Sequence, residues 1–194
     1  MFRKLLIIGF LLNTGAIFAQ PGRPLHPAAP PGTAQMDSMK KQMPPPQKKA
    51  TFDMDYKETG APLPAFIIKQ PNGDLITNKD VQYNANLFVM IFNPTCGHCE
   101  DMTELLKKNI SLFKKTKLLM VATPGMEPYM RKFQEGHHTD EYPTMQIGLD
   151  SSHIIDRLFQ YKMLPQINVY DKDRKLIRTF YGDTPIDSLK TYIE

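Results

Sequence analysis

The only two cysteines of the 194-residue chain, Cys96 and Cys99, are separated by two residues in the stretch NPTCGHCEDM. A pair at this spacing can act as a redox couple, bind a metal, or form a structural disulfide. The structural disulfide is the weakest of these interpretations, because a disulfide stabilises a protein mainly by closing a long loop and two intervening residues close almost none. The stretch therefore indicates redox or metal chemistry.

A buried strand and an amphipathic helix are expected to position the two thiols. The unbroken apolar run LFVMIF at 87–92 is typical of a strand covered on both faces. A helix is predicted over 97–113 from the spacing of its apolar residues, which are Cys99, Met102, Leu106, Ile110 and Phe113.

Cys96 then lies between the end of that strand and the start of the helix. Free backbone N–H groups and the helix dipole favour a thiolate there, and the thiolate is the attacking species in disulfide exchange. Cys99 lies one helical turn further on and on the same side, where it can resolve a mixed disulfide formed by Cys96.

The rest of the pattern predicts an α/β domain. Two short strands are expected around a Pro-Asn-Gly-Asp turn within 65–77, and another buried strand at 117–122. Helices are predicted at 127–134 and at 151–160, the second capped by Asp150, and a hairpin is predicted at 165–182. A last helix is signalled by Thr184 as N-cap, Pro185 at the first helical position and Asp187 at the third. This order implies a central mixed sheet with helices on both faces.

The N-terminal residues resemble an export signal followed by a linker. Residues 1–19 combine a short basic start, an apolar run and a small residue at Ala19, the layout of a cleaved secretory signal peptide. An uncleaved membrane anchor is the alternative, but the apolar run is short for a membrane span. Residues 20–55 are predicted to be a proline-rich disordered tether, so the folded domain is expected over 56–194.

The charge of the chain is too small to indicate a nucleic-acid partner. Removal of residues 1–19 takes away Arg3 and Lys4 and lowers the formal net charge from +4 to +2. No basic stripe alternates with aromatic residues, as nucleic-acid binding would favour. We expect an exported protein, most simply periplasmic, with no stable membrane insertion once the signal is cleaved.

The Cys-Gly-His-Cys stretch after a buried strand, with a Leu-Pro pair before a later strand, resembles the thioredoxin superfamily. The N-terminal hairpin and the export signal look most like its TlpA-like branch of periplasmic thiol–disulfide oxidoreductases. The resemblance covers about residues 61–194. It implies a thioredoxin-like fold with an N-terminal β-hairpin extension and no cofactor beyond the redox-active disulfide Cys96–Cys99. It also implies a monomer that exchanges disulfides with protein substrates and an upstream redox partner.

The resemblance further implies roles for particular residues. Pro165, preceded by Leu164, would have a cis peptide bond and present a backbone edge on which a substrate peptide docks. Apart from the resemblance, Gly97 would let a partner backbone approach closely. The residue types also suggest that His98 either stabilises the thiolate and makes the pair more oxidising or is simply an exposed helix residue. Glu127 would assist proton transfer near the thiols or simply cap a helix.

The chain departs from the family pattern at two positions. Thr95 replaces the tryptophan that usually precedes the first cysteine, and Met90 replaces a buried carboxylate six residues before it. A buried acid helps to deprotonate the resolving thiol, so its absence argues against efficient thioredoxin-like reduction. The direction of exchange, reductase or oxidase and isomerase, stays open.

Two other functions compete with the redox interpretation. The first is a copper-binding or copper-delivery module on the same fold, because thiolate and thioether ligands suit Cu(I). Its candidate ligands are Cys96, Cys99, His26, Met36, Met39, Met43, His137 and His138. The second is a non-catalytic interaction domain, which the intact Cys-Gly-His-Cys stretch disfavours. A closed zinc site needs four ligands that these spacings do not supply.

Overall fold

The computed structural model describes residues 55–82 and 84–194. The predicted signal peptide and residues 20–54 of the predicted tether lie outside the described residues. Tyr56, where the domain was expected to begin, is buried in the core. Within the described part of the chain, no helix is both long enough and apolar enough to cross a membrane.

A seven-stranded mixed sheet forms the centre of the domain, in the order β2-β1-β5-β4-β3-β6-β7. The three central strands β3, β4 and β5 pair in parallel, and every other neighbouring pair is antiparallel. The strands are β1 (Ile67–Lys69), β2 (Leu75–Thr77), β3 (Leu87–Phe92), β4 (Lys117–Ala122), β5 (Met145–Asp150), β6 (Gln166–Tyr170) and β7 (Leu176–Tyr181). The predicted mixed sheet and its N-terminal hairpin are confirmed.

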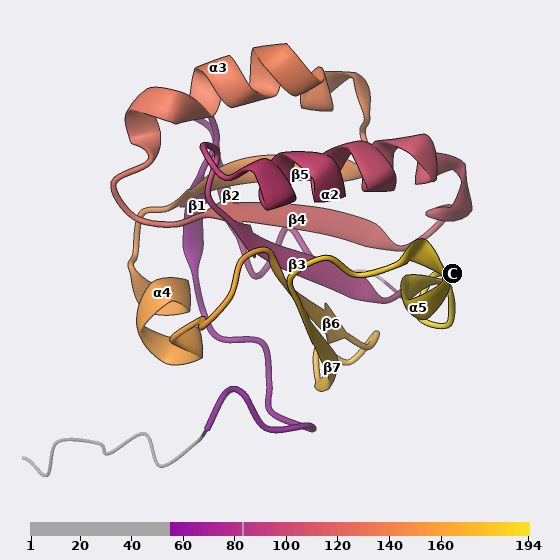
Figure 1. Ribbon diagram of the computed structural model, residues 1–194. Helices are drawn as coiled ribbons and strands as arrows, with labels where there is room; N and C mark the ends of the chain where they lie inside the picture. The colour runs from indigo at the N-terminus through magenta and orange to yellow at the C-terminus, as the bar shows by residue number, and fades with distance from the viewer. Residues whose placement is uncertain (1–54, 83) are drawn as a thin grey trace, which may run out of the picture. The chain divides into compact units, whose positions relative to one another are not determined.

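Helices cover both faces of this sheet, as predicted. Figure 1 shows α2 and α3 on one face and α4 on the other. The helices are α2 (Gly97–Lys108), α3 (Glu127–His137), α4 (Ile154–Phe159) and α5 (Ile186–Lys190). One core cluster joins α2, α3 and Leu189 of α5 to the sheet, while Ile155 and Phe159 of α4 belong to a second cluster. Apolar side chains of β3 alternate between the two clusters, which explains why all six of its residues are buried.

Strand β5 is the element that the sequence analysis missed. It lies between β4 and β1, so it joins the N-terminal hairpin to the parallel strands. Glycine is disfavoured in strands, and Gly148 interrupts the apolar pattern of this one. The structure shows why a glycine stands there: a Cβ on Gly148 would lie 2.5 Å from Cγ2 of Ile68 and 2.8 Å from the carbonyl oxygen of Lys69.

The helix after the cysteine turn is shorter than predicted. Helix α2 ends at Lys108, and a separate 3-10 turn, η1 (Ile110–Leu112), follows. Asn109 separates them, because its side-chain amide donates to the carbonyl of Leu105 at 2.8 Å and its backbone N–H donates to Leu106. The predicted apolar face is nevertheless correct.

Three other local predictions need correction. Helix α3 continues beyond its predicted end at residue 134 and includes His137. Asp150 ends strand β5, although its buried carboxylate still accepts the backbone N–H of Asp156 in α4 at 3.3 Å. Thr184 is not the N-cap of the last helix; Pro185 takes that position, and the Thr184 hydroxyl donates to the carbonyl of Gly182 at 3.3 Å.

The N-terminal segment also pairs with the start of β7, the last strand of the sheet. The N–H of Gly60 donates to the carbonyl of Leu176 at 2.7 Å, and the N–H of Leu176 donates to Ala61 at 2.8 Å. The next residue, Pro62, forms an isolated antiparallel bridge with Lys175. The start of one edge of the sheet is thereby covered.

Candidate functional site

The ends of four strands meet at the edge of the sheet that carries the cysteines. β3 ends at Phe92, and the pairing of Ile91 with Gln166 places Pro165 beside that end. The N–H of Gly182, just after β7, donates to the carbonyl of Pro165 at 2.8 Å. The N–H of Thr123, just after β4, donates to the carbonyl of Phe92 at 3.0 Å. This convergence creates the cysteine site.

Asn93 organises the turn that leads from β3 to Cys96. Its side-chain oxygen accepts the backbone N–H of Thr95 at 2.8 Å and the Thr95 hydroxyl at 2.9 Å. Its backbone carbonyl accepts the N–H of Cys96 at 3.1 Å. The sequence analysis did not single out Asn93, although the dipeptide Asn-Pro is a turn signal.

Cys96 is the N-cap of α2 and is partly exposed, whereas Cys99 is fully buried one turn later. Both are free thiols. The carbonyl of Cys96 accepts the N–H of Cys99 at 2.9 Å, which fixes the turn between them. The structure thus has a partly exposed outer thiol and a buried inner thiol one turn later.

Burial raises the pKa of the Cys99 thiol to about 12, and a hydrogen bond with the Cys96 side chain adds to the shift. A backbone hydrogen bond from Asn93 acts in the opposite direction. Met90, in the position where the family pattern has a carboxylate, is fully buried in the same cluster as Cys99. The inner thiol is therefore held in its protonated form at neutral pH.

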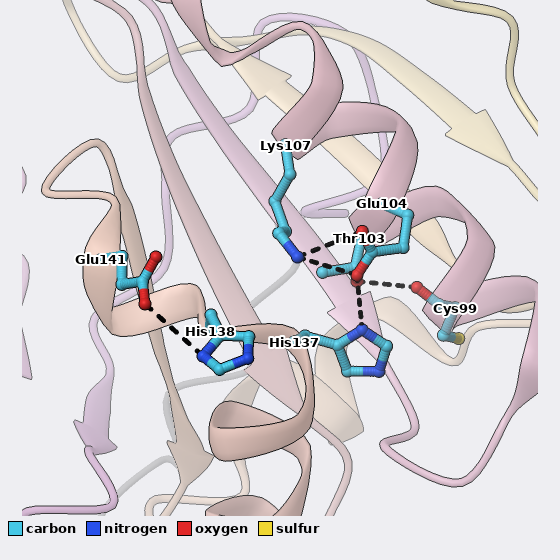
Figure 2. Close-up of polar contacts among 7 residues, drawn as sticks. All are labelled: Cys99, Thr103, Glu104, Lys107, His137, His138 and Glu141. Atoms are coloured by element: carbon cyan, nitrogen blue, oxygen red, sulfur yellow. Dashed lines mark hydrogen bonds and ion pairs between the residues drawn. The ribbon is translucent and has the colours of Figure 1, made fainter.

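The backbone around Cys99 is also fixed by a buried side chain. The hydroxyl of Thr103 donates to the carbonyl of Cys99 at 2.7 Å, as Figure 2 shows. Thr103 is another residue that the sequence analysis did not identify. Serine and threonine in helices commonly make this bond to the carbonyl four residues earlier, so the helical pattern could have indicated it.

His98 projects from the exposed side of α2 and contacts Asp183. Its Nδ1 lies 3.1 and 3.0 Å from the two carboxylate oxygens of Asp183, which follows β7. Both side chains are largely exposed. Asp183 was not among the predicted site residues, because only the fold brings the end of β7 beside the cysteine turn.

The structure places Pro165 and Leu164 at the same edge. The peptide bond between them is cis, as the family resemblance implied. Pro165 is buried, and Leu164 packs against both core clusters, one of which Cys96 also contacts. Gly97 is exposed, and a Cβ added to it would meet nothing within 4 Å.

Glu127, in contrast, is directed away from the cysteines. Its carboxylate pairs with Nζ of Lys69 in β1 at 3.1 Å. Strands β5 and β4 separate β1 from β3 in the sheet. At about 4.8 Å per strand, this puts β1 about 14 Å from β3. The contacts of Glu127 thus give no support to a role in proton transfer.

Among the described residues, two of the suggested copper ligands, His137 and His138, contact other side chains. His137 contacts Glu104 at 2.7 Å and the Phe133 ring, while His138 pairs with Glu141 at 3.5 Å (Figure 2). His26, Met36, Met39 and Met43 lie outside the described residues. Among residues 55–82 and 84–194, no three histidine, cysteine or acidic side chains form a group that could hold a metal ion.

Neither a protein-family model nor a curated protein matches the sequence. Solved structures do match. One is the thioredoxin domain of a thiol–disulfide oxidoreductase from Bacteroides vulgatus, at 20% identity and a TM-score of 0.58, with 71% of this chain and 99% of that chain covered. Another is a candidate thiol:disulfide interchange protein DsbE from Chlorobium tepidum, at 17% identity and a TM-score of 0.57, with 70% and 94% covered. A candidate protein disulfide isomerase from Bacteroides thetaiotaomicron matches at 16% identity and a TM-score of 0.58, with 69% and 86% covered.

These likenesses establish the class of fold. The domain has the thioredoxin-like fold, with a mixed sheet, flanking helices and an added N-terminal hairpin. These neighbours are described as a thiol:disulfide interchange protein and a thiol–disulfide oxidoreductase.

Proposed function

We propose that this protein is an exported thiol–disulfide oxidoreductase whose redox group is the Cys96–Cys99 dithiol. The observation that supports this most strongly is the arrangement of a partly exposed cysteine at a helix N-cap with a buried cysteine one turn behind it. Disulfide exchange needs this asymmetry, because the client's disulfide must reach one thiol, and the other thiol reacts only after the mixed disulfide has formed.

The reaction then takes two steps. The Cys96 thiolate attacks one sulfur of a client disulfide, forms a mixed disulfide and releases the first client thiolate. Cys99 loses its proton and attacks Sγ of Cys96, which forms the Cys96–Cys99 disulfide and releases the second client thiolate. Two electrons pass from the protein to the client, and an upstream dithiol partner must return them; the reverse sequence would oxidise a client.

Pro165 and Leu164 are proposed to guide the client, with Gly97 leaving room for its backbone and His98 stabilising the Cys96 thiolate. Their common location at the edge beside Cys96 supports this assignment. Monomeric action fits a site that one chain supplies completely.

The decisive experiment is to equilibrate the Cys96–Cys99 pair with glutathione and to quantify the redox states by thiol trapping and mass. A potential near −270 mV, roughly the thioredoxin end, would define a reductase, and one near about −120 mV a disulfide donor or isomerase. Cys96→Ser should abolish exchange, and undiminished exchange in that variant would refute the proposal.

Export is proposed from the layout of residues 1–19 and is tested separately. The protein should be recovered from the cell envelope with Gln20 as its first residue. A membrane-bound protein that still carries residues 1–19 would instead indicate an uncleaved anchor.

A further inference from the structure

A groove opens beside the cysteine turn, between α2 and the segment that joins β7 to α5. It has a volume of about 370 Å³, and its lining residues are Asp101, Met102, Leu105, Asp183, Thr184 and Pro185. Met102 and Thr184 are buried and form its floor, and Leu105 is half-buried. Asp101 and Asp183 are exposed on its rim. The groove is thus apolar inside and acidic outside.

The two rim carboxylates differ in their partners. Asp183 is engaged by His98, whereas Asp101 makes no side-chain hydrogen bond or ion pair within the described residues. Two nearby acids are paired with lysines: Glu104 of α2 contacts Lys107, and Asp187 of α5 contacts Lys190. No lysine or arginine lines the groove. An incoming cation would therefore meet a carboxylate, that of Asp101, with which no cation among the described residues is paired.

The groove lies next to the redox site. His98, which lies between the two cysteines, contacts its rim through Asp183. Asp101 stands five residues after Cys96, which corresponds to about 7.5 Å along the helix axis at about 1.5 Å per residue. An extended chain advances about 3.4 Å per residue, so a client held at Cys96 would reach Asp101 with a residue two or three positions from its own cysteine.

We propose that this groove is a client-docking subsite that selects a protein segment carrying a lysine or arginine beside an apolar side chain, close to the reactive cysteine. The apolar side chain covers Met102 and Leu105, and the cation faces Asp101 and Asp183. Opposite charges at a docking surface increase the association rate and discriminate against like-charged partners. The inference rests on the proposed function, which supplies the client.

The test uses the reduced protein and two synthetic peptides, each joined through its single cysteine to glutathione. The peptides differ only in a Lys-Leu or Glu-Leu pair placed two or three positions after the cysteine. We expect reduction of the lysine peptide to be faster by about fivefold or more at low salt, and the ratio to approach one at about 1 M salt, where the Debye length is about 3 Å.

Two variants test whether the preference for the lysine peptide arises in the groove. Asp101→Asn should lower the ratio several-fold, and Asp101→Lys should abolish or reverse it. Asp187→Asn is the matched control, because Asp187 is paired with Lys190 and does not line the groove; it should leave the ratio unchanged. Asp101 is exposed and unpaired, so these variants should fold normally.

Equal rates for the two peptides, or a preference that survives Asp101→Lys, would overturn the docking inference while the proposed function stands. A change of oligomeric state in Asp101→Lys with an unchanged ratio would mean that a second copy of the chain occupies the groove, and would overturn it as well. Failure of the protein to exchange disulfides in either direction, with either peptide or with glutathione, would refute the proposed function, and the inference with it.

Discussion

The two thiols differ in their surroundings more than their closeness in sequence suggests. Cys96 reaches solvent at a helix N-cap, whereas Cys99 is enclosed by Met90 and the α2 core face. Burial raises the pKa of Cys99, and the uncharged Met90 lies in the same cluster, at the position where the family pattern has a carboxylate. Release of the mixed disulfide then depends on solvent or on the departing client thiolate as the base, and we expect this step to be slow.

The first prediction concerns trapping. Cys99→Ser should accumulate a mixed disulfide between Cys96 and a client, because the attack that releases the client is lost. Non-reducing electrophoresis and mass spectrometry measure this adduct. Cys96→Ser is the control and should form none; an adduct in that variant would assign the nucleophile to Cys99.

The second prediction concerns pH. The pKa of Cys99 is raised from 9.0 to about 12 in the folded state, so the folded protein holds a proton that the unfolded chain releases. Its contribution to stability is complete below pH 9 and is lost as the pH rises towards 12. The free energy of unfolding of the reduced protein should fall by up to about 1.4 kcal/mol per pH unit in this window.

Denaturant titrations of the reduced protein between pH 9 and about 12 measure how the free energy of unfolding changes with pH. Cys99→Ala should remove the contribution of this thiol to the pH dependence of unfolding, while Cys96→Ala should retain most of that contribution. Equal slopes in the two variants would contradict the assignment to Cys99.

Among the strands and helices, β5 shows how one residue fixes the packing of a whole element. Gly148 allows β1 to approach at a distance that no side chain would permit. This contact attaches the N-terminal hairpin to the parallel strands. The hairpin is therefore an integral part of the sheet.

The third prediction follows from that contact. Gly148→Ala should lower the free energy of unfolding by about 2 kcal/mol or more, because its Cβ would overlap Ile68 and the backbone of Lys69. Gly136→Ala in α3 is the matched control, since a Cβ there meets nothing within 4 Å. It should stabilise the protein by up to about 1 kcal/mol through helix propensity. Equal effects of the two substitutions would refute the argument.

The fourth prediction concerns the contact between α2 and α3. Glu104 of α2 accepts hydrogen bonds from His137 of α3 and from Lys107, and these lower the pKa of its carboxyl group (Figure 2). A lowered pKa contributes stability above the unfolded value of 4.5 that is lost as the pH falls through the folded value.

Glu104→Gln should therefore destabilise the protein at pH 7 by about 0.5–1 kcal/mol, the range of partly exposed ion pairs. It should also flatten the stability profile below pH 4.5. Urea titrations measure both effects. Asp187→Asn, which removes a single exposed ion pair within α5, should have the smaller effect; the reverse order would contradict the prediction.

At the scale of the whole molecule, local sequence patterns predicted the elements better than they predicted the contacts between them. The hairpins, the β3–α2 unit and the mixed sheet follow from apolar periodicity and turn residues, which act over a few positions. Strand β5 was missed because its glycine is required by close packing against β1, which lies about eighty residues earlier in the chain.

The candidate site likewise combines residues that local sequence patterns indicate with contacts that only the fold creates. Cys96, Cys99 and Pro165 stand in recognisable stretches, but Asp183 reaches His98 only because β7 ends beside the cysteine turn. The ion pair of Glu127 with Lys69 equally depends on how α3 crosses the sheet. Contacts between distant segments are properties of the fold, and a single sequence does not display them.

The two edges of the sheet have a consequence for self-association. Open strand edges can template pairing with another chain, and proteins avoid this with short or proline-blocked edges. Strand β2 has only three residues, and Pro62, which has no N–H to donate, lies along the start of β7. The short β2 and the proline beside the start of β7 therefore reduce the length of free edge from which intermolecular β-sheet could grow in a concentrated solution of this protein.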